Sequence, residues 1–155
     1  MPWTDLLDAG RIVVLDDAGT RAQVLDAAAR LLCGDAPSAQ AHALSEALQE
    51  REALASTAIG HGVAIPHARG EGLEVRAAFL RLARPVDFGA RDGAPVDLVF
   101  AMTANHDRPE LHLEHLAGVA AGLSDPDLRE RLRAARTPAQ LRALLLPRAA
   151  AAHAA

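Results

Sequence analysis

The stretch VDLVFAM, from Val96 to Met102, decides the fold of this chain. Every residue in it except Asp97 is apolar, so a strand of this sequence would be buried on both faces. Such a strand lies inside a sheet that helices cover on both sides. Two further apolar segments, Val63–Ile65 and Arg76–Leu82, are bounded by Gly, Pro and Asp clusters and are also predicted to be strands.

Helical patterns flank these strands on both sides in the sequence. A short strand is predicted at Arg11–Leu15, where Ile, Val and Val follow one another. We therefore predict an α/β fold, with a central β-sheet flanked by helices on both faces. The predicted helices run from a cap at Thr20 to about Cys33 and from about Ala39 to Glu52, and three more begin near Glu110, at Ser124 or Asp125, and at Thr137.

The composition is that of one globular domain. The chain has 155 residues, of which 50% are hydrophobic and 23% charged. Only 3% are aromatic, with no Tyr, and the formal net charge is −4. Single-strand binding by base stacking and non-specific DNA binding are therefore disfavoured, and we expect no nucleic-acid partner.

Cysteine content and the termini indicate a cytoplasmic location. Cys33 is the only cysteine, so the chain can form no internal disulfide. The N-terminus lacks the basic and apolar regions of a signal peptide, and no segment has the roughly 18 apolar residues of a membrane helix. We expect no direct membrane insertion. The Ala-rich residues 149–155 are expected to be disordered, which leaves residues 1–148 as the domain.

The segment STAIGHGVAIPHAR, from Ser56 to Arg69, presents one histidine in an unusual setting. Pro66 fixes its own φ and favours an extended residue before it, while Gly60 and Gly62 permit backbone paths closed to other residues. We expect His67 to be held at a fixed angle in an accessible place. An imidazole with a pKa near 6.5 is mostly neutral at cytoplasmic pH and has one lone pair free to attack.

This segment resembles the phosphorylation site of the enzyme IIA domains of the bacterial phosphotransferase system, in the fructose/mannitol class that includes the nitrogen-regulatory branch. Arg51-Glu52 stands before Ser-Thr as the family's arginine does. Two further segments match in order and spacing, namely DGAPVDLVFAM from Asp92 and HLEHLAGVA from His112. The resemblance identifies residues 1–148 as one type-2 IIA domain, with the mixed sheet of the phosphotransferase/anion transport protein-like fold.

The resemblance implies a phosphocarrier. His67 would be the phosphorylated nucleophile, and Arg51 and His112 would stand beside it. His115, three residues after His112, is read as a histidine at the helix–sheet interface. The donor would be an HPr-like histidine phosphocarrier, and the acceptor an enzyme IIB or permease, or a regulatory target protein. No metal or organic cofactor is needed.

Other residues are expected at the border of the site. Thr57 and the backbone of Gly60 and Gly62 could contact phosphate oxygens. His61 departs from the family, which usually has Asn there. An apolar surround that admits a partner protein is expected from Val63, Ile65, Leu111 and Leu116.

Two alternatives remain open from the sequence. One is a metal-dependent hydrolase, although the chain has no HExxH motif; its ligands would come from His61, His67, His106, His112 and His115, with Glu110 or Glu114. The other is a regulatory binding module of the same fold that transfers no phosphoryl group.

Overall fold

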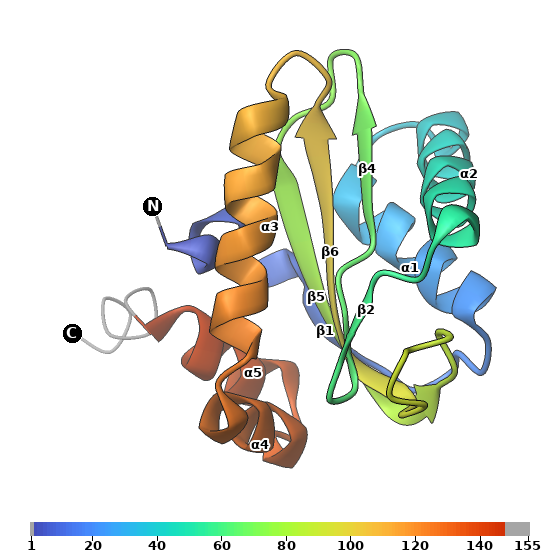
Figure 1. Ribbon diagram of the computed structural model, residues 1–155. Helices are drawn as coiled ribbons and strands as arrows, with labels where there is room; N and C mark the ends of the chain where they lie inside the picture. The colour runs from blue at the N-terminus through green and yellow to red at the C-terminus, as the bar shows by residue number, and fades with distance from the viewer. Residues whose placement is uncertain (1, 148–155) are drawn as a thin grey trace.

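The computed structural model describes residues 2–147 and contains a single mixed sheet between two layers of helices (Figure 1). The strand order is β1-β5-β6-β3-β2, and β4 also pairs with β6. β5 runs antiparallel to β6, whereas β3 and β4 run parallel to it. The strands are β1 (Ile12–Leu15), β2 (Ala58–Gly60), β3 (Val63–Ala64), β4 (His67–Gly70), β5 (Arg76–Val86) and β6 (Val96–Asn105).

The stretch quoted first forms most of β6, which lies inside the sheet as predicted. Its side chains alternate between two cores: Leu98, Phe100 and Met102 belong to one, and Val99 and Ala101 to the other. All five are fully buried. Burial of alternate residues in opposite directions requires a helical layer on each face, and this explains why an uninterrupted apolar run specifies the architecture.

Each face of the sheet carries its own set of helices, which confirms the predicted α/β class. α1 (Arg21–Cys33) and α2 (Ser38–Leu54) cover one face, while α3 (Pro109–Leu123), α4 (Pro126–Ala134) and α5 (Pro138–Leu145) cover the other (Figure 1). Two 3₁₀ turns, Trp3–Leu6 and Ala9–Arg11, precede β1. No helix within residues 2–147 is both long and apolar enough to cross a bilayer.

The helix starts follow the capping signals in the sequence. Thr20 forms a capping box with Gln23 at the start of α1, and the Thr137 side chain accepts from the backbone N–H of Gln140 at the start of α5. Pro126 and Pro138 occupy first-turn positions, where their missing N–H costs nothing. α2 extends two residues beyond the predicted end, so Arg51 lies in its last turn.

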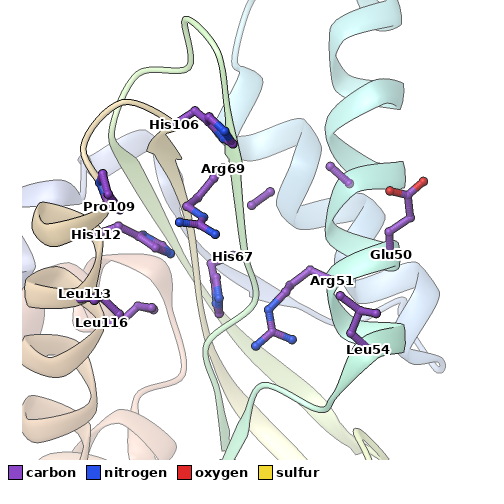
Figure 2. A pocket seen from close by; sticks show the side chains of 12 residues that line it. Glu50, Arg51, Leu54, His67, Arg69, His106, Pro109, His112, Leu113 and Leu116 are labelled. Carbon is purple, nitrogen blue, oxygen red and sulfur yellow. The ribbon is translucent and has the colours of Figure 1, made fainter.

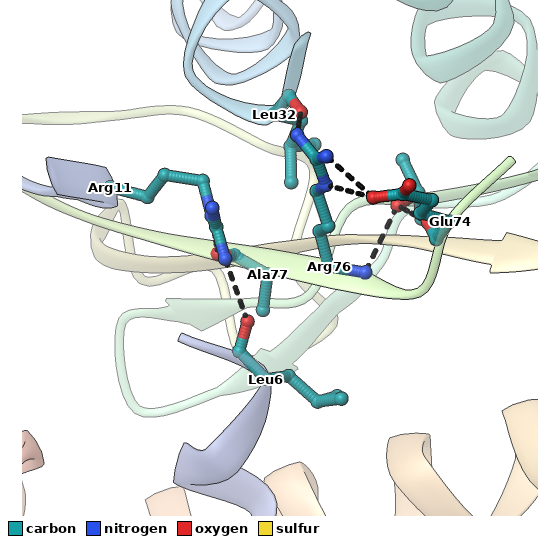
Figure 3. A network of polar contacts seen from close by, with 7 residues as sticks. Leu6, Arg11, Leu32, Glu74, Arg76 and Ala77 are labelled. Atoms are coloured by element: carbon teal, nitrogen blue, oxygen red, sulfur yellow. Dashed lines mark hydrogen bonds and ion pairs between the residues drawn. The ribbon is translucent and has the colours of Figure 1, made fainter. Parts of the chain in front are cut away.

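Two arginine side chains, those of Arg11 and Arg76, link the sheet to neighbouring segments (Figure 3). Arg76, at the start of β5, donates from Nε to Glu74 at 2.9 Å and from Nη1 to the carbonyl of Leu32 in α1. Arg11 donates from Nε to the carbonyl of Ala77 at 2.9 Å and from Nη2 to that of Leu6. These bonds tie the start of β5 to α1 and to the N-terminal turn.

The backbone around His67 contains a second strand beyond the one predicted at Val63–Ile65. β3 and β4 are successive segments along the same side of β6, with Val63 opposite Leu98 and His67 opposite Met102. Pro66 interrupts them because it has no N–H, yet its carbonyl still accepts from the N–H of Met102 at 2.9 Å. His67 therefore begins a strand, β4. The predicted disordered segment 149–155 lies outside the described residues.

Candidate functional site

A cavity of about 590 Å³ lies between α2, β4 and α3, and His67 is at its wall (Figure 2). β4 contributes residues 67–69, α2 contributes its last two turns, and α3 contributes its first two turns. The lining residues are Ala47, Glu50, Arg51, Leu54, His67, Ala68, Arg69, His106, Pro109, His112, Leu113 and Leu116.

The ring of His67 is held in one tautomer by the backbone. Its Nδ1 lies 2.8 Å from the carbonyl oxygen of Ile65. Because a carbonyl oxygen only accepts, Nδ1 carries the proton and donates it, and the lone pair is on Nε2. Burial has the largest effect on the pKa of His67 and lowers it below 6.5; the charges of Arg51 and Arg69 also lower it, against the opposing effects of the hydrogen bond to the Ile65 carbonyl and of Glu52. The ring is therefore a neutral imidazole near pH 7.

His112 faces His67 from the first turns of α3. The two ring centroids are 5.1 Å apart and the planes are tilted by 56°. His112 is only 5% exposed, and neither ring nitrogen has a hydrogen-bond partner among the described residues. Burial first, and then the charges of His67, Arg69, His115 and Arg51, lower its pKa from 6.5 to about 4. His112 is thus a neutral ring whose polar atoms are available to a ligand in the cavity.

Arg51 brings a guanidinium to the same cavity from the last turn of α2. Its Nη1 donates to the carbonyl of Ala55 at 3.0 Å, just after the end of α2. This bond satisfies that carbonyl and leaves the other N–H donors of Arg51 free for a ligand. The structure therefore brings together the three residues predicted for the centre of the site, which come from α2, β4 and α3.

Thr57, predicted at the border, does not line the cavity. Its hydroxyl and its backbone N–H both donate to the carboxylate of Glu52, each at 2.6 Å. Both residues are buried, Thr57 to 7% and Glu52 to 2% exposure. The pair closes the turn between α2 and β2, so its place is behind the site, where it supports the end of the helix that carries Arg51.

Gly60 and Gly62 are also absent from the cavity wall, because the β2–β3 hairpin turns toward α4. Arg133 of α4 donates from Nε to Asp97 at 2.9 Å and from Nη2 to the carbonyl of His61. The glycines serve the turn: their φ values are 94° and 77°, and His61 between them has a φ of 57°. His61 departs from the family's Asn but keeps a left-handed conformation that Asn and His adopt more readily than most residues.

The apolar surround differs in part from the prediction. Val63 and Ile65 are buried in the core, and Leu111 does not line the cavity. Leu116 does line it, together with Leu54 and Leu113, which are 83% and 66% exposed. Two large apolar side chains thus stand in solvent at the rim, one on α2 and one on α3.

Arg69, which the sequence analysis did not single out, also lines the cavity, as does His106, which was considered only as a metal ligand. Arg69 follows His67 by two residues within β4, and residues two apart in a strand share a face. Had His67 been placed in a strand, this spacing would have found Arg69. His106 comes from the loop after β6.

The histidines do not form a metal centre in the described part of the chain. Within residues 2–147, no group of three or more His, Cys, Asp or Glu side chains is arranged to hold a metal ion. His115 lies half-buried on α3 outside the cavity wall, and the two glutamates proposed with it, Glu110 and Glu114, are not in that wall either.

Comparison with known proteins shows the family to which the chain belongs. A nitrogen regulatory protein from Pseudomonas aeruginosa is 43% identical over 133 residues, or 85% of this chain and 86% of that protein. The crystal structure of nitrogen regulatory protein IIA-Ntr from Neisseria meningitidis superposes with a TM-score of 0.80 at 33% identity, covering 92% of this chain and 97% of that one.

The mannitol IIA enzyme of Escherichia coli, solved in complex with phosphorylated mannitol IIB, shares the fold with a TM-score of 0.68 at 19% identity, covering 90% of this chain and 98% of that one. The family model described as "Phosphoenolpyruvate-dependent sugar phosphotransferase system, EIIA 2" matches residues 5–147. These findings support a phosphocarrier or regulatory role in general terms, and the chain belongs to the EIIA 2 family of the phosphoenolpyruvate-dependent sugar phosphotransferase system.

Proposed function

We propose that this protein is a phosphocarrier that accepts a phosphoryl group on Nε2 of His67. The observation that carries the proposal is the 2.8 Å contact between Nδ1 of His67 and the Ile65 carbonyl. It fixes the proton on Nδ1 and the lone pair on Nε2, as a nucleophile at phosphorus requires. The lowered pKa of His67 keeps that lone pair free at neutral pH.

The transfer is balanced without a net proton movement. The N–P bond of the donor phosphohistidine breaks, and its electron pair returns to the donor imidazole, which leaves neutral. A new N–P bond forms to Nε2 of His67, while Nδ1 keeps its proton and its bond to the Ile65 carbonyl. The positive charge that develops on the His67 ring is offset by the phosphoryl dianion and by the carbonyl dipole.

Phosphoryl transfer depends on positioning and on compensation of the charge on the oxygens. Arg51 supplies a guanidinium, whose forked donors match phosphate oxygens. His112 supplies one N–H from a buried ring that has no described partner. A hydrogen bond from this ring to the phosphoryl group would satisfy a buried donor that otherwise carries a desolvation cost.

A protein partner fits the rim better than a small molecule does. Leu54 and Leu113 project beside the cavity at 83% and 66% exposure, and exposed apolar side chains beside a polar centre are typical of interaction sites. We assign the donor as an HPr-like histidine phosphocarrier or its nitrogen-related counterpart. The acceptor is an enzyme IIB or permease, or a regulatory target protein that responds to the phosphorylation state.

Regulatory use of the site is the second candidate, and the names of two similar proteins favour it. The P. aeruginosa relative and the N. meningitidis structure are both described as nitrogen regulatory proteins. In this form the protein binds a target in one phosphorylation state. A phosphoryl group adds up to two negative charges between His67 and His112 and would change the electrostatics of the rim.

The test is phosphorylation by enzyme I, a histidine phosphocarrier and phosphoenolpyruvate, scored by intact mass and acid lability. We expect one acid-labile phosphoryl group on the wild type and none on His67→Ala. His42→Ala is the matched control, because His42 is exposed on α2 and lies outside the cavity. An adduct that persists on His67→Ala refutes the assignment. A wild type that takes no phosphoryl group from several carriers favours a regulatory module that does not transfer.

A further inference from the structure

Arg69 is the cavity residue whose role neither the sequence nor the family description assigns. It lies in β4 two residues after His67, so both side chains leave the same face of the strand, and both line the cavity (Figure 2). Ala68, between them, belongs to the core beneath α1 and α2 and also forms part of the cavity wall.

The guanidinium of Arg69 has no protein partner among residues 2–147. Other arginines near the sheet are paired: Arg76 with Glu74 and Arg133 with Asp97, each at 3.0 Å or less. The Arg69 side chain takes part in none of the hydrogen bonds or ion pairs found in the described part of the chain. Its five N–H donors are therefore free to bind a ligand.

Arg69 also acts on both histidines of the site. Its charge lowers the pKa of His67 and of His112, as does the charge of Arg51. In Figure 2 the His67 ring lies between the two guanidiniums, with Arg51 on the α2 side and Arg69 toward His112. Two cations thus act on one imidazole from different elements, and no Asp lines the cavity, whose one acidic residue is Glu50.

We propose that Arg69 and Arg51 together form a two-arginine binding site for a phosphate dianion at Nε2 of His67. The inference deepens the proposed function and rests on it for its biological use. Two guanidiniums match the two negative charges of a phosphoryl group, and each can give a forked pair of hydrogen bonds to its oxygens. Arg69 would hold the oxygens on the His112 side and Arg51 those on the α2 side.

The binding test uses inorganic phosphate on the unphosphorylated protein, so it does not depend on any carrier. Phosphate at pH 8 and low salt is titrated into the wild type, Arg69→Gln, Arg69→Lys and the control Arg91→Gln, and is followed by the imidazole NMR signals of His67 and His112. Arg91 is an exposed arginine in the turn between β5 and β6, outside the cavity. We expect Arg69→Gln to weaken phosphate binding about 10- to 100-fold, as for loss of a charged hydrogen bond.

A second readout separates a binding role from a structural one. Removing the positive charge of Arg69 should raise the pKa of both His67 and His112, whereas Arg69→Lys should keep both near the wild-type values and recover part of the phosphate affinity. Wild-type phosphate affinity in Arg69→Gln overturns the proposal. Failure of the wild type to accept a phosphoryl group from carriers would instead overturn the proposed function, and the phosphate titration would still decide the role of Arg69.

Discussion

Acidification below about pH 6.5 should destabilise this protein through His112, although the ring of His112 in the folded protein becomes charged only near pH 4. In the folded state burial holds the pKa of His112 at about 4, against 6.5 for an ordinary histidine. Between these values the unfolded chain binds a proton at His112 that the folded chain does not. The free energy of unfolding therefore falls as the pH drops from 6.5 toward 4, and this contribution is absent above pH 6.5.

The size of the effect follows from the pKa difference. One pKa unit corresponds to about 1.4 kcal/mol, so the loss at pH 5 is at most about 2 kcal/mol. The cavity beside His112 is open to solvent, which screens the charge, and we reduce this figure by half to about 1 kcal/mol. The charges that face the ring come from α2, β4 and α3, in Arg51, Arg69, His67 and His115, and all of them act in the same direction.

The assay is urea unfolding at pH 8 and pH 5, followed by circular dichroism, for the wild type and His112→Gln. Because glutamine does not titrate, we expect the stability difference between the two pH values to shrink by about 1 kcal/mol in the variant. His42→Gln, on the exposed side of α2, controls for the loss of an imidazole remote from the cavity. An equal pH dependence in His112→Gln and the wild type would refute the reasoning.

Three further outcomes concern the stability of the fold. Gly62→Ala should destabilise the fold by about 1–3 kcal/mol in thermal unfolding, because its φ is 77° and the new methyl group would meet Arg133. Glu52→Gln should cost about 1–3 kcal/mol, since it leaves one of the two buried donors of Thr57 without an acceptor; an unchanged melting temperature would contradict this. Thr20→Ala removes the capping box of α1 and should cost about 1 kcal/mol in urea unfolding, with phosphorylation unaffected.

The architecture could be predicted because its signals are local. A run that is apolar on both faces, as in β6, has one physical solution, a covered sheet. Thr20 and Pro138 similarly mark helix starts through bonds made within one turn. The strands β2 and β4 were missed because their sequences, AIG and HARG, lack the run of β-branched residues that marked β1, and the pairing that defines β4 is with β6, more than thirty positions away.

The centre of the site could also be predicted, but its border could not. His67, Arg51 and His112 were found from motifs, and they line one cavity. Gly60 and Gly62 were misplaced because the direction of the hairpin depends on Arg133, a residue in α4 with no sequence signal that links it to the turn. Leu113 lines the cavity in place of the predicted Leu111, a difference of about half a helical turn that only the docking of α3 determines.

The N-terminal turn has a spectroscopic consequence. Trp3 is the only tryptophan in the chain, and its ring contacts the Phe100 ring edge-on, with centroids 5.5 Å apart. It also sits against Gly122 so closely that a methyl group there would overlap the indole. The fluorescence of this single tryptophan therefore reports on the position of α3. His112 lies in the same helix, about 15 Å along its axis from Gly122. Any movement of that helix when a phosphoryl group or a partner arrives can be followed in the unlabelled protein.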